Sequence, residues 1–386
     1  MDTPKILIVD DEPDLELLIR QKYRKEIRDG RYAFSFARNG REALEKLRED
    51  PSIEVVLSDI NMPEMDGLTL LGQIRELANP VLKAVIVSAY GDMENIRTAM
   101  NRGAFDFLTK PIDFTDLETT IQKTLEQLGL LKSALKARDE LVSVQHELGL
   151  AHGIQQSILP RVFPARKDVA LAATMIPAKE VGGDFYDFFF VDEHRLGFVM
   201  ADVSGKGVPA AIYMALSRTL LKSTAAAGVA PEVCLANVNA ALCAEGGSGL
   251  FVTVFYGILD TRSGQVVYAN GGHPSPYLCR AGEPAREIPG CDSPIVGILA
   301  RAEFRGGSVT LAPGDALVLF TDGVTEAMNA KDDLYGDEKL LELLSGIGAG
   351  PLEEILSGMV ADVRAFAGGT PQSDDVTLLA LRYLGA

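Results

Sequence analysis

Short apolar runs alternate with amphipathic helical stretches over the first 125 residues. The runs typical of buried strands lie at 5–9, 33–36, 54–58, 84–88 and 106–109, and helical periods separate them. This alternation predicts a five-stranded parallel sheet with helices on both faces, a doubly wound α/β domain over residues 1–125. In such a sheet, the carboxyl ends of the strands form the edge where ligands bind.

Residues 114–159 have a different pattern, in which Gly and Pro are scarce and apolar residues recur every seven positions. The pattern predicts one long helix, which Pro160 ends because its ring does not fit a helix interior. The apolar line later moves to Leu141 and Leu148, a shift typical of a stutter in a coiled coil. We favour a coiled-coil linker that forms a homodimer; an amphipathic helix packed on a neighbouring domain is the alternative. The first heptad positions are Leu117, Ile121, Leu128, Leu131, Leu135 and Val142.

From residue 160 onward, β-like runs dominate the chain. They lie at 170–176, 195–201, 251–259, 266–269, 308–311, 316–320 and 376–382, and helical stretches lie at 209–226, 231–244, 337–344 and 352–366. Strands at hairpin spacing with grouped helices predict an α+β sandwich, in which helices cover antiparallel sheets. The sequence thus predicts two domains, at 1–125 and 160–386, and a helical linker at 114–159.

Composition narrows the function classes. The chain has 386 residues, enough for two domains, and a hydrophobic fraction of 47% excludes a wholly disordered protein. A net charge of −17 argues against nucleic acid as a partner, since phosphates bind Lys and Arg. No apolar run approaches the ~18 residues of a membrane span, and the acidic N-terminus is unlike a secretion signal. Four scattered cysteines predict reduced thiols, which are typical of the cytoplasm. We therefore expect a cytoplasmic protein, and the short apolar runs argue against a membrane partner.

Five polar residues stand at the ends of the predicted parallel strands: Asp10, Asp11, Asp59, Ser88 and Lys110. Three carboxylates at one edge repel each other unless a cation lies between them, and oxygen ligands suit Mg²⁺. The Lys ammonium and the Ser hydroxyl can bind carboxylate or phosphoryl oxygens. With its charge compensated in this way, Asp59 can attack phosphorus as a nucleophile.

These residues, together with Asn-Met-Pro-Glu-Met-Asp-Gly at 61–67 and Lys-Pro at 110–111, resemble the response-regulator receiver domain over residues 4–125. The resemblance implies that Asp59 is the phosphoacceptor for a sensor histidine kinase. It also implies that Asp11, Asp59 and the Asn61 carbonyl hold Mg²⁺, that Asp10 assists through water, and that the 110–111 peptide is cis. The implied switch residues are Ser88 and Lys110, which would bind the phosphoryl oxygens, and Phe107.

Four short acidic motifs mark the C-terminal part, at 181–187, 200–207, 320–326 and 373–376. Each places an Asp beside Gly or a small residue at a strand end, and Gly allows the backbone to approach a ligand closely. Carboxylates without matching His or Cys suit Mg²⁺ or Mn²⁺, and two such ions about 4 Å apart can hold a phosphate ester for in-line attack. The motif aspartates are Asp184, Asp202, Asp322 and Asp374.

Each motif alone is weak evidence, because Asp-Gly is a common turn sequence. The first, Gly-Gly-Asp-Phe at 182–185, invites comparison with diguanylate cyclases but lacks their second acidic residue. In order, the four motifs resemble the metal-dependent serine/threonine phosphatases (PPM class), in particular the bacterial sporulation and stress-response branch, over about 150–386. The turn Asn-Gly-Gly-His-Pro at 270–274 is also familiar in that branch.

The phosphatase resemblance implies a role for each motif residue. Asp202 would bridge two or more Mn²⁺ or Mg²⁺ ions, with the Val203 carbonyl on one of them. Asp322 and Asp374 would complete the shell of the other ion, and Asp184 would join the same cluster. Supporting rather than ligating roles are expected for Asp187, Asp375 and His273, and Lys206 is a poor candidate for binding the substrate phosphate.

We therefore expect a two-component response regulator whose phosphorylation at Asp59 controls a protein serine/threonine phosphatase. The resemblance implies a phosphorylated anti-sigma-factor antagonist as substrate, in sigma-factor partner switching. The stretch 148–160 resembles the helix that opens this phosphatase branch, so a movement of the linker would reach the motif at 181–187. The alternative is an adaptor, in which an inactive phosphatase fold binds a partner protein; the four intact motifs favour the enzyme. Whether phosphorylation activates or inhibits is left open.

Overall fold

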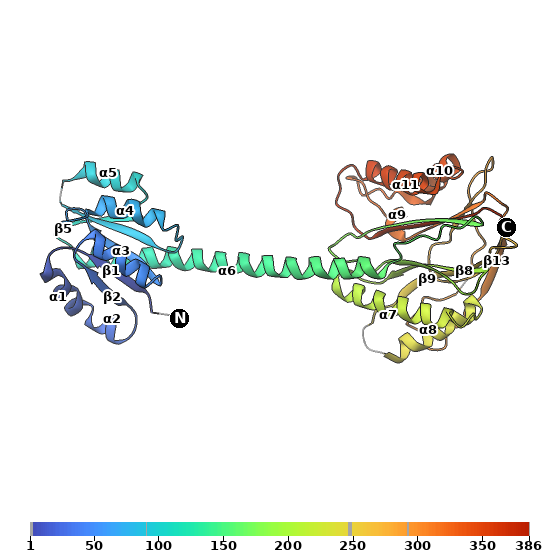
Figure 1. Ribbon diagram of the computed structural model, residues 1–386, viewed down its shortest axis with the longest axis horizontal. Coiled ribbons are helices and arrows are strands. Elements are labelled where there is room, and N and C mark those ends of the chain that lie inside the picture. The colour runs from blue at the N-terminus through green and yellow to red at the C-terminus, as the bar shows by residue number, and fades with distance from the viewer. Residues whose placement is uncertain (1–2, 90, 246–248, 292, 386) are drawn as a thin grey trace. The chain divides into compact units, whose positions relative to one another are not determined.

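The computed structural model of the chain describes residues 3–89, 91–245, 249–291 and 293–385. The chain divides into two compact units, residues 1–143 and 144–386. One long helix, α6 (Phe114–Ile158), contributes residues to both units (Figure 1). The described helices include none with both the length and the apolar character of a membrane-spanning segment.

The first unit is built on one parallel sheet of five strands in the order β2-β1-β3-β4-β5. The strand order changes direction at β1, which is the doubly wound topology that the sequence predicts. Ile, Leu and Val fill the central strands because helices cover both faces of the sheet. The elements are β1 (Lys5–Val9), α1 (Pro13–Lys22), α2 (Arg24–Arg28), β2 (Ala33–Ala37), α3 (Gly40–Glu49), β3 (Ile53–Asp59), α4 (Gly67–Glu76), β4 (Lys83–Ala89), α5 (Met93–Asn101) and β5 (Asp106–Lys110).

The beginning of α6 belongs to the core of the first unit. Leu117, Ile121 and Leu128 are buried there against the face of the sheet that also carries α1. Further along α6, Leu141 and Val142 are 58% and 57% exposed. Three of the first heptad positions, Leu117, Ile121 and Leu128, are thus occupied within the unit, whereas Val142 and Leu141 offer apolar side chains to a partner.

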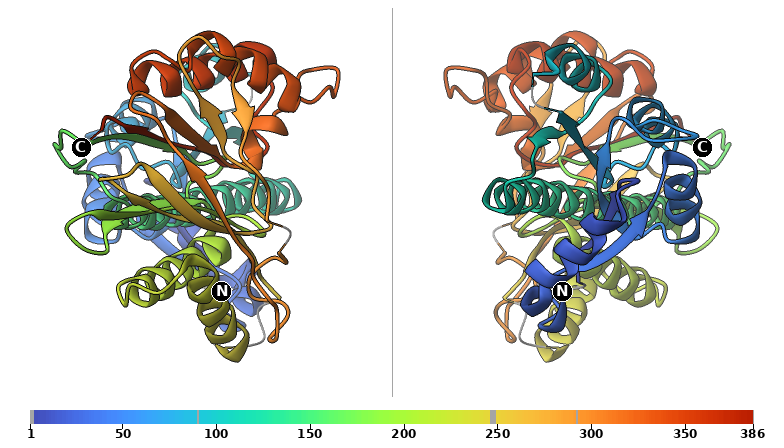
Figure 2. Two further views of the ribbon diagram at one scale, coloured as in Figure 1. Left: turned by 90° about the vertical axis from the view of Figure 1, so that its right-hand side faces the viewer. Right: turned by 90° about the vertical axis from the view of Figure 1, so that its left-hand side faces the viewer.

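The second unit is a sandwich of two antiparallel sheets, in the orders β13-β10-β9-β8-β7 and β12-β11-β14-β15-β6. The main apolar core fills the space between the sheets. Helices α7 and α8 cover the first sheet, and α10 and α11 cover the second (Figures 1 and 2). This architecture confirms the predicted α+β sandwich. Its elements are β6 (Val169–Ile176), β7 (Phe185–Phe190), β8 (Arg195–Val203), α7 (Val208–Ala225), α8 (Pro231–Glu245), β9 (Val252–Asp260), β10 (Gln265–Gly271), β11 (Tyr277–Cys279), β12 (Arg286–Glu287), β13 (Gly306–Thr310), β14 (Ala316–Phe320), α9 (Asp322–Thr325), α10 (Gly336–Ile347), α11 (Leu352–Ala367) and β15 (Val376–Tyr383).

The sequence analysis missed β7, the strand that follows the first acidic motif. Its residues, Phe-Tyr-Asp-Phe-Phe-Phe, form an aromatic run without the alternation of apolar and polar positions that marks a half-buried strand. In the structure β7 pairs antiparallel with β8 along its whole length. Asp184 therefore stands immediately before one edge strand of the sandwich, beside Asp202 of β8.

Candidate functional site

The predicted acidic edge of the first unit is present. The carboxylate oxygens of Asp10, Asp11 and Asp59 lie within 4.8 Å of one another at the ends of β1 and β3. Asp10 and Asp59 are buried, whereas Asp11 is exposed. Burial raises the pKa of Asp10, and the nearby Lys110 opposes that rise. A spacing of this kind lets one hard cation bind several carboxylates at once, so the site fits Mg²⁺.

Lys110 and Ser88 converge on the same edge. The Lys110 Nζ lies 2.8 Å from an oxygen of Asp59, 3.0 Å from Asp10 and 3.1 Å from Glu12. Burial alone would lower the pKa of Lys110, but its hydrogen bonds to these carboxylates raise it overall. The Ser88 hydroxyl is buried and has no hydrogen-bond partner. An unpartnered buried donor beside a carboxylate cluster suits an incoming oxyanion.

Two further receiver residues, Asn61 and Phe107, are exposed. Asn61 follows the end of β3, and its role as a ligand stays a prediction. Phe107 on β5 is 38% exposed, so its ring is turned outward in this conformation. The Lys110–Pro111 peptide is cis, as the family resemblance implies.

In the second unit, four segments that are far apart in sequence meet between the two sheets. Asp184 precedes β7 and Asp202 lies in β8 of the first sheet. Asp322 begins α9, directly after β14, and Asp374 precedes β15 of the second sheet. The charges of Asp322 and Asp374 reach Asp202, and the Asp184 carboxyl is hydrogen-bonded to it. The four predicted aspartates therefore converge.

The Asp184–Asp202 pair is the most buried part of this cluster. Asp184 is 1% exposed, and its carboxyl accepts a hydrogen bond of 2.7 Å from the Thr321 hydroxyl. Burial and the charge of Asp202 raise the pKa of Asp184 well above its ordinary value. Burial likewise raises the pKa of Asp202 to about 7, although the hydrogen bond with Asp184 opposes the rise. Two buried carboxyls that lie side by side favour a bound cation, because a cation compensates the charge that burial penalises.

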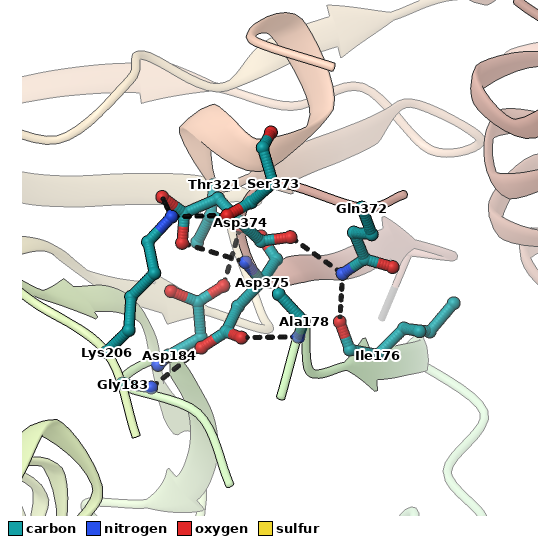
Figure 3. Close-up of polar contacts among 10 residues, drawn as sticks. All are labelled: Ile176, Ala178, Gly183, Asp184, Lys206, Thr321, Gln372, Ser373, Asp374 and Asp375. Carbon is teal, nitrogen blue, oxygen red and sulfur yellow. Dashed lines mark hydrogen bonds and ion pairs between the residues drawn. The ribbon is translucent and has the colours of Figure 1, made fainter. Parts of the chain in front are cut away.

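The outer part of the cluster includes a cationic side chain, that of Lys206. Its Nζ lies 2.8 Å from Asp374 and also donates to the Ser373 carbonyl (Figure 3). Burial raises the pKa of Asp322, and the charges of Glu326 and Asp374 add to the rise. Lys206 thus balances part of the negative charge and is engaged by a motif aspartate.

Asp375 holds the first motif against the last. One of its oxygens accepts from the Ala178 amide at 2.8 Å, and the other accepts from the Gly183 amide at 2.7 Å (Figure 3). A Cβ on Gly182 would lie 2.2 Å from that second oxygen, so only glycine fits there. Because backbone amides occupy both oxygens, Asp375 supports the pocket, whereas the carboxylate of its neighbour Asp374 points toward Lys206.

The last turns of α6 support the same motif, through a residue whose role the sequence analysis missed. Gln155 is 4% exposed. Its side-chain amide donates to the Gly182 carbonyl at 2.6 Å and accepts from the Gly182 amide at 3.1 Å. His152, one turn earlier, is hydrogen-bonded to the Glu180 carbonyl at 2.7 Å. Thr321 was missed in the same way, although it directly precedes Asp322.

Two further residues of the sequence analysis lie outside the carboxylate cluster. Asp187 is buried on β7 and pairs with Arg218 at 2.7 Å and Lys222 at 3.4 Å, both on α7. His273 is buried, with its Nδ1 2.8 Å from the Thr253 hydroxyl and its backbone amide and carbonyl both bonded to Asn270. Burial lowers the pKa of His273 to about 3. A neutral imidazole that orders its turn is a poor general acid at neutral pH.

The donor chemistry of the second unit fits hard divalent cations. The groups that could bind a cation there are carboxylates and backbone carbonyls. The Val203 carbonyl oxygen lies close to the first motif, since a Cβ added to Gly183 would be 2.7 Å from it. In the described part of this unit, no three carboxylates lie within 4.8 Å of one another. A cation would therefore be held by carboxylates in pairs, with water completing its shell, as in sites that keep open positions for substrate.

Comparison with known proteins agrees with both units. The model of the response regulator receiver domain matches residues 6–122. The model of the Stage II sporulation protein E (SpoIIE) family matches residues 192–384, half of the chain. The SiaA-PP2C domain of Pseudomonas aeruginosa, at 24% identity, has the fold of the second unit, with a TM-score of 0.56 over 63% of this chain and 98% of that one.

Two relatives cover different shares of the chain. Protein IcfG of Synechocystis sp. is 29% identical over 262 residues, which are 61% of this chain and 41% of IcfG. Phosphoserine phosphatase RsbU of Bacillus subtilis is 30% identical over 184 residues, which are 47% of this chain and 54% of RsbU. The chain thus spans about half the length of these relatives or less. By its second unit the chain belongs to the Stage II sporulation protein E (SpoIIE) family of phosphatases, and by its first it carries a response regulator receiver domain.

Proposed function

We propose that this protein is a response regulator whose phosphorylation at Asp59, by a sensor histidine kinase, controls a metal-dependent protein serine/threonine phosphatase. The observation that carries the proposal is the convergence of Asp184, Asp202, Asp322 and Asp374 in one pocket. The name of RsbU, a phosphoserine phosphatase, supports phosphoserine as the group removed. The substrate we propose is a phosphorylated anti-sigma-factor antagonist, and the place of action is the cytoplasm.

The proposed metal ligands are the four aspartates and the Val203 carbonyl, with Asp202 shared between two Mn²⁺ or Mg²⁺ ions. Such ions supply positive charge for a phosphate ester and acidify water. The protein's own contribution is orientation: Thr321 fixes Asp184, and Asp375 ties the backbone of 183–184 to the last motif. Lys206 lies at the exposed side of the pocket, where it can attract an anionic substrate before binding.

Control would act through α6. The receiver, residues 1–125, would bind Mg²⁺ through Asp10, Asp11, Asp59 and Asn61, and Ser88 and Lys110 would bind the phosphoryl group. Residues 114–159 would serve as the linker and the homodimer interface, and residues 160–386 as the phosphatase. Because Gln155 holds the backbone of Gly182, a rotation or tightening of α6 would move the first motif relative to the other three.

The test is dephosphorylation of a serine-phosphorylated protein by the full chain in the presence of Mn²⁺. We expect turnover by the wild type and loss of turnover in Asp202→Ala, while Asp192→Ala, an exposed surface aspartate, retains it. Equal rates in wild type and Asp202→Ala would discard the enzyme. Tight binding of a phosphoprotein without turnover in either protein would favour the adaptor.

The receiver half of the proposal has a separate test. Phosphorylation of the wild type with acetyl phosphate should change the phosphatase rate or the solution mass, and Asp59→Asn should abolish the change. A response that persists in Asp59→Asn would remove Asp59 as the phosphoacceptor.

A further inference from the structure

One long strand of the phosphatase unit has an open edge. Strand β6 is the last strand of its sheet and pairs with β15 along its whole length, from Val169 to Ile176. No strand in the described part of the chain pairs with its other side. Its sequence, Val-Ala-Leu-Ala-Ala-Thr-Met-Ile, contains no charged residue, Pro or Gly. Soluble proteins normally protect an edge of this length with such residues, so this edge can accept a further strand.

A groove runs along this edge beside α11. It contains a cavity of 430 Å³ lined by Ala172, Ala173, Thr174 and Ile176 of β6 and by residues of α11 that include Val360 and Arg364. Consecutive strand residues point to opposite faces of a sheet, so a cavity that touches three in a row follows the backbone of the strand. The groove therefore exposes the groups that would hydrogen-bond to an added strand.

The groove extends toward the segments that carry Asp322 and Asp374. A second cavity, of 210 Å³, shares Ile176, Val360 and Arg364 with the first and is also lined by Gly323 and Ser373. These last two residues adjoin Asp322 and Asp374 in sequence. At the end of β6, the Gln372 amide donates to the Ile176 carbonyl at 2.8 Å and to the Asp374 carbonyl at 2.6 Å (Figure 3).

We propose that the open edge of β6 and the groove beside α11 bind an extended segment of the phosphoprotein substrate as an added strand. This inference rests on the proposed phosphatase function. The phosphorylated residue would leave the groove at the carboxyl end of β6, where the chain reaches Asp374. In strand addition, backbone hydrogen bonds provide affinity and side-chain pockets provide selectivity.

The lining of the groove indicates which segment would fit. The second cavity is mostly aliphatic, which suits an apolar side chain of the substrate close to the phosphorylated residue. Arg364 is exposed and lines both cavities, whereas the acidic Glu353 lines only the first, in a chain with a net charge of −17. A cation at this position is complementary to an anionic, phosphorylated segment, whereas a second copy of this acidic chain would bring no such charge.

The first experiment tests the hydrogen-bonding pattern. The probe is a phosphoserine peptide that matches the eight residues of β6 in length, with two further versions N-methylated at alternate amides. In an added strand, alternate amides face the edge, so one methylated version should lose about tenfold in kcat/KM and the other should retain the value of the parent. Equal values for the two methylated versions would overturn the proposal.

The second experiment uses Thr174→Lys, because a lysine on an edge strand blocks pairing. The matched control is Val267→Lys, a partly exposed strand residue of the other sheet. We expect Thr174→Lys to lower the ratio of kcat/KM for the phosphopeptide to that for p-nitrophenyl phosphate about tenfold, and Val267→Lys to preserve it. An unchanged ratio in Thr174→Lys would overturn the proposal. A change only in the solution mass of this variant would also overturn it, because the edge would then bind a second copy of the chain.

Binding without catalysis separates the two proposals. Fluorescence anisotropy of the labelled phosphopeptide in a chelator should show binding by the wild type and weaker binding by Thr174→Lys. Hydrolysis of p-nitrophenyl phosphate without peptide binding would overturn the docking edge and leave the phosphatase intact. Peptide binding without hydrolysis of either substrate would support the docking edge and overturn the enzyme.

Discussion

Acidification should destabilise the phosphatase unit through one buried residue, His273. Burial lowers its pKa in the folded protein to about 3, against about 6.5 in the unfolded chain. Between these two values the unfolded chain binds one proton more than the folded chain, so stability falls as the pH falls through that window. At pH 5 the unfolded imidazole is almost fully protonated, and the folded state should lose about 2 kcal/mol relative to pH 7.

The measurement is urea unfolding of the full chain at pH 7 and pH 5, followed by circular dichroism, in the transition that belongs to the phosphatase unit. Carboxyl groups also contribute to acid unfolding, so the informative quantity is the difference in pH dependence between wild type and His273→Asn. The Asn amide of this variant can replace Nδ1 as the partner of Thr253. That variant should lack about 2 kcal/mol of the pH dependence. The exposed His146, changed to Asn, serves as the control and should leave the pH dependence intact. If wild type and His273→Asn lost the same stability on acidification, the assignment of a buried neutral imidazole would be wrong.

Three further predictions concern packing, charge and metal. Gly323→Ala would place a Cβ 2.0 Å from the Asp375 carbonyl oxygen, so it should lower the free energy of unfolding by about 2 kcal/mol or more in urea melts, and an unchanged midpoint would contradict the packing. Arg218→Met would leave the buried Asp187 carboxylate with the more distant Lys222 as its cationic partner, beside the Phe188 amide, and the loss should be about 3 kcal/mol, largely restored by Asp187→Asn in the same chain. Mn²⁺ at about 100 times its dissociation constant should stabilise the phosphatase unit by about 2.7 kcal/mol, and Asp202→Ala should remove this shift in differential scanning calorimetry.

The sequence predicts the scaffold well because local pattern determines it. Strands β1 and β3–β5 are short apolar runs bounded by helical periods, so each of their limits differs from the predicted one by at most one residue. The acidic motifs could be recognised because each combines Asp with a small residue at a strand end. Strand β7 could not be recognised, since its aromatic run, interrupted by Asp187, lacks the alternation of apolar and polar positions.

The residues that support the pocket could not be predicted from the sequence, for a different reason. Three of them form hydrogen bonds to groups that are distant in the chain: Gln155, Thr321 and Gln372. The most distant partner is Ile176, which bonds to Gln372. Nothing local distinguishes such a side chain from an ordinary surface residue. The neighbours Asp374 and Asp375 show the same limit, because only the pairing of β15 with β6 decides which of them faces the first motif.

The hydrogen bonds between Gln155 and Gly182 also constrain where this second unit can be joined to another sensory domain. A phosphatase fragment that begins at Pro160 would lack both Gln155 and His152, and its first motif would lose two of the residues that hold it. The last turns of α6 therefore belong with the second unit, whose first acidic motif they hold. Gene fusions that exchange one sensory input for another must join upstream of His152 and must preserve helical phase across the junction.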